Sequence, residues 1–384
     1  MFHTSQIEIS KSALQSNIKF LQKMLGAKTK LSSVIKGNAY GHGIDLFVPL
    51  AEECGVEHFS VFSANEALMV YDRKAPETDL MIMGMINNDE LQWAIERGVE
   101  FYVFELDRLQ HAIQTAKKCA KPAKIHIELE TGMNRTGFAP VELKHAIELI
   151  HSNRQQIEIK GVCTHYAGAE SITNFVRVKK QIQNFKKVNA FLESHDIVAE
   201  RRHTACSAAS VAYPQTRMDM ARIGIMQYGF WPSRETFIHY LSNRIRKTDP
   251  LQRIINWKSS VMSVKDVKRG EFVGYGTSFM AEYDMKIATV AVGYAHGYSR
   301  SLSNMGRVLI HGQRLSVIGM VNMNMLIIDC TGLDNNVEKG DEVVFIGKQG
   351  DNELSVHSFG ELSKQLNYEL LTRLPHDIPR RVVE

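Results

Sequence analysis

The stretch Lys30-Leu-Ser-Ser-Val-Ile-Lys36-Gly-Asn-Ala-Tyr40-Gly-His-Gly43 is a short apolar strand that closes on a lysine and continues into a glycine-rich loop. An amphipathic helix precedes it over 10–25, where Ser10 is a plausible N-cap and the apolar residues recur at helical spacing. Strand and helix signals of the same kind then alternate far along the chain. This alternation is typical of a parallel sheet covered by helices.

Eight strand signals occur before residue 235. They cover 30–36, 58–62, 80–83, 100–104, 124–129, 157–162 and, more weakly, 202–205 and 218–223. Helix signals lie between them over 64–71, 89–96, 106–118, 141–151 and 174–194. Eight such repeats over about 230 residues predict a (β/α)8 barrel of the TIM type.

The pattern changes after about residue 235. Short strands at 254–264, 271–273, 287–292, 307–310, 313–317, 325–329 and 341–346 are separated by Gly or Asn turns, and a late helix covers 355–366. We therefore expect a barrel over 10–235 and a mainly β C-terminal domain over 236–384. The N-terminal strand signal at 6–9 is expected to join that second domain, so residues 1–9 are grouped with it.

Composition excludes several classes of protein. Of the 384 residues, 44% are hydrophobic and 23% charged, which is too apolar and too balanced for a disordered chain. The five cysteines are scattered and form no CxxC pair, so neither a disulfide framework nor a structural zinc site is expected. Basic residues are not clustered as in nucleic-acid-binding proteins, and no apolar run is long enough to span a membrane. We expect a cytoplasmic protein without bound metal.

A lysine that closes a barrel strand lies where the catalytic groups of such barrels gather. Partial desolvation there would lower the pKa of Lys36 and suit Schiff-base chemistry. A lysine extending from a strand end into solvent is the simpler interpretation of this residue alone. The glycines that follow it would let the backbone approach a cofactor closely.

The loop Ile35-Lys36-Gly-Asn-Ala-Tyr40-Gly-His-Gly43 resembles the pyridoxal-phosphate attachment signature of the alanine racemase family. The similarity extends over almost the whole chain in the right order. It includes Glu130-Thr-Gly-Met-Asn-Arg135, Thr164-His165-Tyr-Ala, His203-Thr-Ala-Cys-Ser207, Arg222-Ile-Gly224-Ile225, Gly274-Tyr275-Gly-Thr-Ser, Gly293-Tyr294-Ala-His-Gly, Val321-Asn-Met323-Asn-Met and Asn367-Tyr368-Glu.

The resemblance implies that Lys36 carries pyridoxal phosphate covalently and acts as a base on one face of the substrate Cα. The base on the other face would be Tyr275, supplied by the neighbouring subunit, so the active sites would be shared across a homodimer. His165 and Arg135 are the matched residues that would adjust the pKa of Tyr275. Without the resemblance, Tyr275 is equally an aromatic residue in a glycine turn.

Further cofactor contacts follow from the same resemblance. The phosphate would be held by hydroxyls and backbone amides of Tyr40, Ser207, Gly224, Ile225 and Tyr368, while His165 and His203 complete the cofactor site. Arg222 would face the pyridine nitrogen. Because a guanidinium gives up no proton at ordinary pH, the nitrogen would stay unprotonated, which favours reversible proton transfer over decarboxylation.

Three positions depart from the family pattern. Glu128 stands where a lysine, carbamylated in many members, commonly occurs, and we expect its carboxylate to orient Arg135 directly. Cys206 replaces an asparagine and is interpreted as a packing residue. Asn324 replaces an aspartate beside Met323, a substrate contact, whereas Tyr294 and Tyr368 remain and favour a small side chain.

The leading hypothesis is an alanine racemase that supplies D-alanine for peptidoglycan, with a small-molecule amino acid as its partner. The alternative is a racemase of broader specificity for serine, lysine or other amino acids, motivated by Asn324. A barrel decarboxylase is disfavoured by Arg222. A non-catalytic cofactor carrier lacks the second domain, and an inactive homologue would lack Lys36 or Tyr275.

Overall fold

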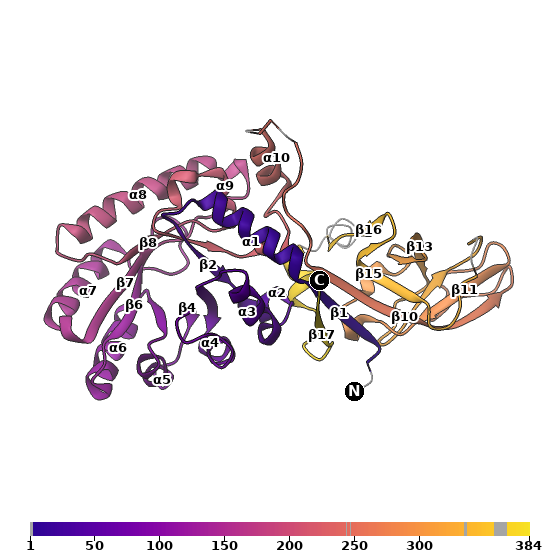
Figure 1. The fold of residues 1–384 in the computed structure, drawn as a ribbon, viewed down its shortest axis with the longest axis horizontal. Helices are drawn as coiled ribbons and strands as arrows, with labels where there is room; N and C mark the ends of the chain where they lie inside the picture. Colours follow the sequence, from indigo (N-terminus) through magenta and orange to yellow (C-terminus); the bar gives the residue numbers. More distant parts are fainter. Residues whose placement is uncertain (1–2, 243, 246, 334–335, 357–366) are drawn as a thin grey trace. The chain divides into compact units, whose positions relative to one another are not determined.

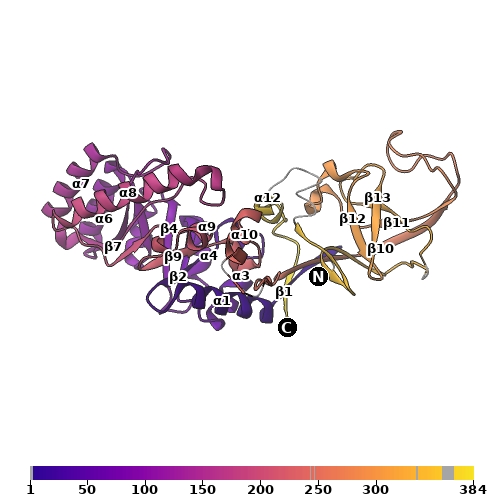
Figure 2. The same cartoon turned by 90° about the horizontal axis from the view of Figure 1, so that it is seen from above.

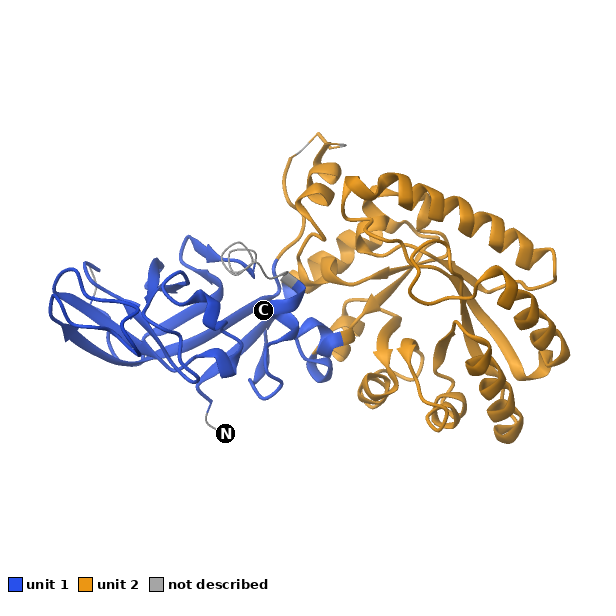
Figure 3. Cartoon of the chain, turned by 180° about the vertical axis from the view of Figure 1, so that it is seen from behind, with its two compact units in different colours: residues 1–12, 37–46, 253–384 blue, residues 13–36, 47–252 orange. Residues whose placement is uncertain are grey.

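The computed structural model describes residues 3–242, 244–245, 247–333, 336–356 and 367–384. Within it the chain forms two compact units, coloured separately in Figure 3. Unit 1 comprises 1–12, 37–46 and 253–384, and unit 2 comprises 13–36 and 47–252. The chain therefore passes between the units more than once, and the loop that follows Lys36 belongs to unit 1.

Unit 2 contains a parallel sheet of eight strands among the described residues, in the order β8-β7-β6-β5-β4-β3-β2-β9. The strands are β2 Lys30–Val34, β3 His58–Ser63, β4 Asp79–Met85, β5 Glu100–Val103, β6 Ala123–Glu128, β7 Ile157–Cys163, β8 Arg201–His203 and β9 Met220–Ile223. Between β8 and β9 the ring is nearly closed, because Asp219 N donates to Arg202 O and Arg222 N to Ala205 O. The predicted barrel is confirmed.

Helices lie on the outer side of these strands in unit 2 (Figure 1). They are α1 Lys11–Leu25, α3 Ile44–Glu53, α4 Ala64–Tyr71, α5 Leu91–Glu96, α6 Leu106–Cys119, α7 Pro140–Ser152, α8 Phe175–Glu193, α9 Ser207–Ala212 and α10 Arg234–Ser242, with α1 and α3 crossing the division between the units. The first helix buries the apolar face that its periodicity indicates, including Leu14, Ile18 and Leu21.

Unit 1 is mainly β, and its strands lie side by side in Figure 2. Nine described strands form one sheet in the order β16-β15-β12-β13-β14-β11-β10-β1-β17. They are β1 Ser5–Ser10, β10 Ile255–Val267, β11 Met285–Val290, β12 Arg307–Ile310, β13 Gln313–Ile318, β14 Leu326–Asp329, β15 Glu342–Gln349, β16 Asn352–Leu354 and β17 Arg380–Val383, together with helix α12 Asn367–Thr372. The predicted N-terminal strand pairs with β10 and β17 as expected.

Two expectations for this unit differ from the structure or lie outside it. The strand predicted at 271–273 was wrong: only an isolated bridge between Phe272 and Met280 forms, because positive-φ Gly270 and Gly274 turn the chain on both sides. The helix predicted at 355–366 falls almost entirely outside the described residues. β16, α12 and β17 were not predicted.

The loop after Lys36 forms a left-handed turn. Asn38, Ala39 and Tyr40 have φ values of 54°, 53° and 52°, and such a conformation costs roughly 1–2 kcal/mol for each residue with a Cβ. Hydrogen bonds hold it: Gly41 N donates to Gly37 O over 2.9 Å and the Asn38 side chain accepts from Ile44 N over 2.9 Å. The turn fixes the direction of the chain directly after Lys36.

No helix in the described part of the chain is both long and apolar enough to cross a membrane.

Candidate active site

Lys36 follows the carboxyl end of β2, where the backbone N–H of Ile35 still bonds to Ser60 O over 2.9 Å. The residue as a whole is exposed, although burial of its amine is the largest influence on its pKa. Desolvation, followed by the positive charges of Arg135 and Arg222, lowers its pKa, and Glu66 only partly opposes them. The lysine is therefore easier to deprotonate than a free amine, as the sequence suggested.

Arg222 on β9 is almost completely buried, and its partners among the described residues are acceptors on the barrel. Its Nη1 donates to Nδ1 of His203 and to the carbonyl oxygen of His203, both over 2.6 Å. Its Nη2 donates to Thr164 O over 2.8 Å and to Thr204 O over 3.4 Å. These contacts fix the position of the guanidinium, whose charge acts on the pKa of Lys36.

His165 follows β7 and is held through its carbonyl oxygen, which accepts from Gln181 Nε2 over 3.0 Å. Burial, assisted by the charges of Arg222, Arg135 and Lys36, lowers the pKa of His165 to about 3. Its imidazole is therefore neutral at physiological pH and can act as a hydrogen-bonding group rather than as a charge.

Glu128 ends β6 and is 4% exposed. Burial raises its pKa, and a hydrogen bond from Thr136 and the charges of Arg135 and Arg222 work in the opposite direction. Glu128 thus lies within the electrostatic reach of both arginines.

The loop that carries Arg135 is shaped by the carboxylate of Glu130, a residue that was not among the predicted site residues. Glu130 accepts N–H bonds from Gly132, from Met133 over 2.8 Å and from Asn134 over 2.8 Å. Arg177 on α8 adds bonds to Gly132 O over 3.0 and 3.2 Å. The glycine and asparagine that follow Glu130 within four residues are a turn signal, and this signal could have indicated that its carboxylate accepts bonds from the loop.

Ser207 and the Gly224–Ile225 segment lie together. The backbone N–H of Gly224 donates to Ser207 Oγ over 3.0 Å, and both residues are buried. Ile225 begins the 3-10 helix Ile225–Tyr228. Of the predicted site residues, Lys36, Glu128, Arg135, His165, His203, Ser207, Arg222, Gly224 and Ile225 all belong to the barrel unit.

The remaining predicted site residues belong to unit 1. Tyr40 and Tyr368 are neighbours there, with ring centroids 5.9 Å apart. Their contact follows from the packing of the left-handed turn on α12, since a Cβ on Gly41 would lie 1.9 Å from Leu371 O.

Tyr294 and Met323 are brought together by backbone hydrogen bonds between their segments. Tyr294 N donates to Asn322 O over 3.0 Å and Ala295 N to Met323 O over 2.9 Å. Tyr294 is 39% exposed and Met323 56%, and Asn324 is exposed as well. Tyr275, between Gly274 and Gly276 at positive φ, is 72% exposed. Unit 1 thus presents these residues on its surface.

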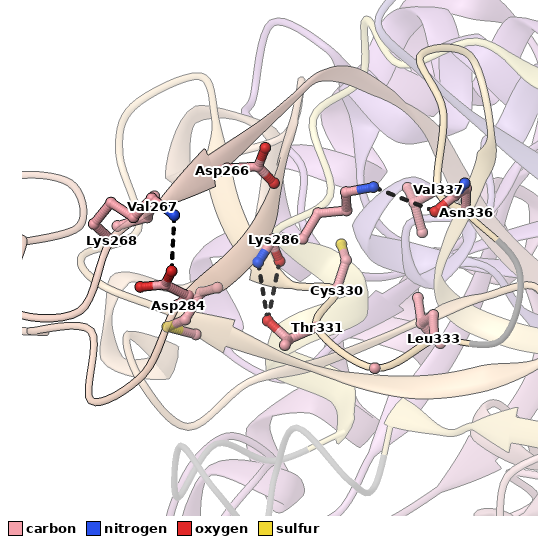
Figure 4. Close-up of a pocket in the computed structure, with 12 residues that line it drawn as sticks. Asp266, Val267, Lys268, Asp284, Lys286, Cys330, Thr331, Leu333, Asn336 and Val337 are labelled. Atoms are coloured by element: carbon pink, nitrogen blue, oxygen red, sulfur yellow. Dashed lines mark hydrogen bonds and ion pairs between the residues drawn. The ribbon is translucent and has the colours of Figure 1, made fainter.

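A cavity of about 320 Å³ lies elsewhere in unit 1 (Figure 4). Its lining includes the Lys268–Asp284 ion pair at 2.7 Å and Lys286, whose Nζ lies 3.3 Å from Asn336 Oδ1. None of the predicted site residues lines it. Among the described residues, no cluster of His, Cys, Asp and Glu is suited to a metal ion.

Comparison with known proteins identifies the family. The family model "Alanine racemase, N-terminal domain" matches residues 9–232, and "Alanine racemase, C-terminal domain" matches 254–382. An alanine racemase of Leptospira interrogans is 32% identical over 100% of this chain and 96% of its own. One of Methanococcus maripaludis is 33% identical over 98% of each chain.

Solved structures agree. The alanine racemase of Bacillus anthracis with bound L-Ala-P is 28% identical, with a TM-score of 0.89 over 100% of this chain and 96% of that one. The alanine racemase of Bartonella henselae with covalently bound pyridoxal phosphate is 25% identical, with a TM-score of 0.85 over 100% of both chains. By sequence and by fold, the chain belongs to the alanine racemase family of isomerases.

Proposed function

We propose that the protein interconverts L- and D-alanine with pyridoxal phosphate as cofactor, using Lys36 and Tyr275 as the two bases. We extend the proposal to a homodimer with shared active sites, to a cytoplasmic location and to the supply of D-alanine for peptidoglycan. The domain limits 10–235 and 236–384 stay a prediction. The observation that carries the proposal is the placement of Lys36, with its lowered pKa, beside a buried guanidinium that can only donate hydrogen bonds.

The residues of the barrel suit pyridoxal phosphate. Ser207 Oγ accepts from the N–H of Gly224 and keeps its own O–H as a donor, and with the N–H of Ile225 it would hold a phosphate without a counter-charge. Lys36 supplies the amine for covalent attachment, and Arg222 supplies a donor for the ring nitrogen. When bound, the cofactor withdraws electrons from the substrate and so acidifies its Cα proton.

Lys36 acts as the base on one face. A base must be able to shed its own proton near the working pH, and desolvation together with the neighbouring arginines lowers the cost of doing so. The positive charges of Arg135 and Arg222 that depress this pKa also attract the carboxylate of an amino acid. One set of charges therefore both prepares the base and orients the substrate.

Arg135 is positioned by two carboxylates in this proposal. Glu130 shapes its loop, and Glu128 faces it electrostatically from the end of β6. Glu128 thereby carries the negative charge that a carbamylated lysine carries in many members of the family. His165, neutral with a pKa of about 3, contributes hydrogen bonds and no charge.

Tyr275 acts on the other face, in the site of a second copy. Its exposed fraction of 72% means that its own chain does not cover it, although a catalytic tyrosine needs polar neighbours to shift its proton affinity. Tyr294, Met323 and Asn324 are also exposed and would accompany it. A barrel mouth with charged groups and a β unit with exposed site residues complement each other across two copies.

Substrate size and charge separate alanine from the alternative substrates. Tyr294 and Tyr368 are bulky and favour a methyl side chain. Asn324 stands where the family has an aspartate, and the loss of that carboxylate would admit other substrates. Racemisation rates with L-alanine, L-serine and L-lysine on the purified protein test the choice. A higher kcat/KM for lysine or serine than for alanine contradicts the alanine assignment and leaves the broader racemase.

The cofactor attachment is tested by absorbance. The purified protein with pyridoxal phosphate is expected to show a band at about 410–430 nm that Lys36→Ala removes. Lys186→Ala, an exposed lysine of α8, is the matched control and is expected to retain both band and activity. The assignment is contradicted if Lys36→Ala keeps the band and if borohydride reduction followed by peptide mapping then finds the cofactor on another lysine.

The two-base scheme is tested by isotope exchange. In deuterated water, Tyr275→Phe is expected to lose exchange starting from one alanine enantiomer and to retain it from the other. Equal loss with both enantiomers contradicts the scheme. Mixing Tyr275→Phe with Lys36→Ala subunits tests sharing, because a mixed dimer regains one intact site only if each subunit supplies residues to the other.

A further inference from the structure

A continuous chain of buried hydrogen bonds crosses the inside of the barrel and ends at Arg222. Arg222 Nη1 lies 2.6 Å from His203 Nδ1, His203 Nε2 lies 2.8 Å from His126 Nδ1, and His126 Nε2 lies 2.8 Å from Glu100 Oε2. All four residues are at most 5% exposed. Glu100 begins β5, His126 lies within β6, and His203 ends β8, so the chain connects several strands.

The two ends of this chain determine where every proton lies. A guanidinium can only donate, so Nδ1 of His203 must be the unprotonated nitrogen that accepts. Nε2 of His203 then carries the proton and donates to Nδ1 of His126, and Nε2 of His126 donates to the carboxylate. Both imidazoles are neutral Nε2–H tautomers, and both point the same way.

Glu100 is held as the acceptor at the far end. Burial alone would raise its pKa, but the hydrogen bond from His126 and the contact with His58 lower it below the ordinary value. His58 Nε2 lies 3.5 Å from Oε2, and Arg201 Nη1 lies 3.5 Å from Oε1. An ionised carboxylate cannot donate, so the order of the chain cannot reverse while Glu100 keeps its charge.

The histidines are kept neutral by the groups that face them. Burial lowers the pKa of His126, and His58 and Arg201 lower it further against the opposing effect of Glu100. Burial and the charge of Arg222 hold the pKa of His203 well below its ordinary range, with His126 and His58 acting in the same direction. A proton added to either ring would have to face a cation or an N–H group.

The backbone of β7 makes room for the contact between the two rings. The pairing of β6 with β7 is irregular between Ile125 and His126, which places Gly161 opposite His126. A Cβ on Gly161 would lie 2.1 Å from His126 Nδ1 and 2.8 Å from His203 Nε2. The glycine is needed here for space, because any side chain would occupy the hydrogen bond itself.

Most of the N–H groups of Arg222 are already used in hydrogen bonds to the protein. Four of its five N–H groups are used by His203 Nδ1, His203 O, Thr164 O and Thr204 O. Among the described residues the N–H on Nε has no acceptor, so it is the donor left to reach a ligand. A histidine with its proton on Nδ1 would repel Nη1 and disturb the orientation of this last donor.

We propose that Glu100, His126 and His203 are positioning residues that act through Arg222: a one-way hydrogen-bond chain that aims its remaining donor at the cofactor ring. This inference rests on the proposed function for the identity of the ligand. The tautomers and their order concern the protein alone, so they can be measured whether or not the protein racemises alanine.

The tautomers are measured by long-range ¹H–¹⁵N NMR of histidine-labelled protein, with and without pyridoxal phosphate. Spectra of His126→Gln and His203→Gln assign the two residues. We expect both residues to be neutral Nε2–H tautomers and to stay so between about pH 5.5 and 8.5, the range in which an ordinary histidine changes its charge. An Nδ1–H tautomer or a titration of either residue in this interval overturns the proposal, even if racemase activity is present.

The effect on Arg222 is measured by the kinetics of two variants of His126. Their side chains are similar in size but differ in whether they can accept and donate hydrogen bonds. His126→Gln can still accept from His203 and donate to Glu100, whereas His126→Leu can do neither. We expect His126→Leu and Gly161→Ala to lower kcat about tenfold with little change in KM, and His126→Gln to recover most of that loss.

Ser60→Ala is the matched control inside the barrel. It removes the 2.5 Å bond between Ser32 and Ser60 without touching the chain and is expected to retain kcat. Equal loss of kcat in His126→Gln and His126→Leu, in proportion to their loss of thermal stability, would mean that the chain is only structural. If the wild type does not racemise alanine, the proposed function fails while the NMR result still decides the order of the chain.

Discussion

The interior of the barrel and the core of the β unit bury different chemistry. Glu100, His126, His203 and Arg222 occupy the barrel and are joined by hydrogen bonds. The β unit buries apolar and aromatic groups, for example Trp257, whose ring lies 4.8 Å from that of Phe345. The barrel interior thus holds residues joined by hydrogen bonds, whereas the β unit is held together by apolar and aromatic packing.

Trp257→Ala in β10 is expected to have the largest effect on stability. Trp257 is completely buried, and removing a buried tryptophan side chain costs about 3–5 kcal/mol of unfolding free energy. Urea unfolding followed by circular dichroism measures it. Phe272→Ala, at a residue 53% exposed, is the control and should stay within about 0.5 kcal/mol of the wild type. A small loss for Trp257→Ala would mean that the β unit repacks.

Glu100→Gln tests the barrel interior and depends on pH. Because its pKa is lowered in the folded protein, the carboxylate stabilises the fold above the unfolded pKa of about 4.3, and this contribution is lost as pH falls. We expect a loss of about 3 kcal/mol at pH 7. The difference between variant and wild type should shrink below about pH 4. A difference that is constant from pH 7 to 3 would contradict an ionised Glu100.

Gly41→Ala tests the left-handed turn of unit 1. The new Cβ would lie 1.9 Å from Leu371 O, at a φ of +81°. We expect a loss of about 1–3 kcal/mol from the strained backbone. Gly26→Ala has a similar φ of +85° but open space around the Cβ, so it isolates the conformational cost alone, about 1 kcal/mol. Equal losses for both variants would show that the contact with Leu371 is relieved at no cost.

Tyr275→Phe is expected to have the smallest effect on stability. Its side chain is 72% exposed, so the unfolding free energy should change by less than about 0.5 kcal/mol while racemisation is lost. Thermal unfolding at several protein concentrations checks this and also reports whether association contributes. A large loss of stability that does not depend on concentration would place the tyrosine in the core of its own chain and contradict its proposed role.

Local patterns were enough to predict most of the fold. The helix over 64–71 and the strand over 307–310 were placed at their observed bounds, since capping and periodicity are properties of neighbouring residues. The strand at 271–273 failed because flanking glycines prevent extended pairing. The strand 380–383 escaped because it is stabilised by the distant β1 rather than by its own pattern. The strand 352–354 pairs with the neighbouring β15 but has only three residues, too few to show an alternation.

Some residues of the site were predicted and others were missed, again because only local patterns can be found in the sequence. Lys36 and Arg222 were indicated by strand ends and by resemblance. Glu100 was missed, and so was His126, although the alternation Lys124, His126, Glu128 placed polar residues on the inward face of a barrel strand. Polar residues on that face were the available signal. Their partners could not be inferred, because residues 26 and 77 positions away supply them.

The order of strands and helices, the lysine two residues after β2 and the turn-forming glycines follow from the amino-acid sequence alone, because they depend on spacing and on local backbone preference. The direction of the hydrogen-bond chain and the neutrality of its histidines follow from the folded structure. Both depend on burial and on which end meets a carboxylate and which a guanidinium, and those are set by strands far apart in the chain. The exposed fraction of Tyr275 is likewise a property of the folded surface.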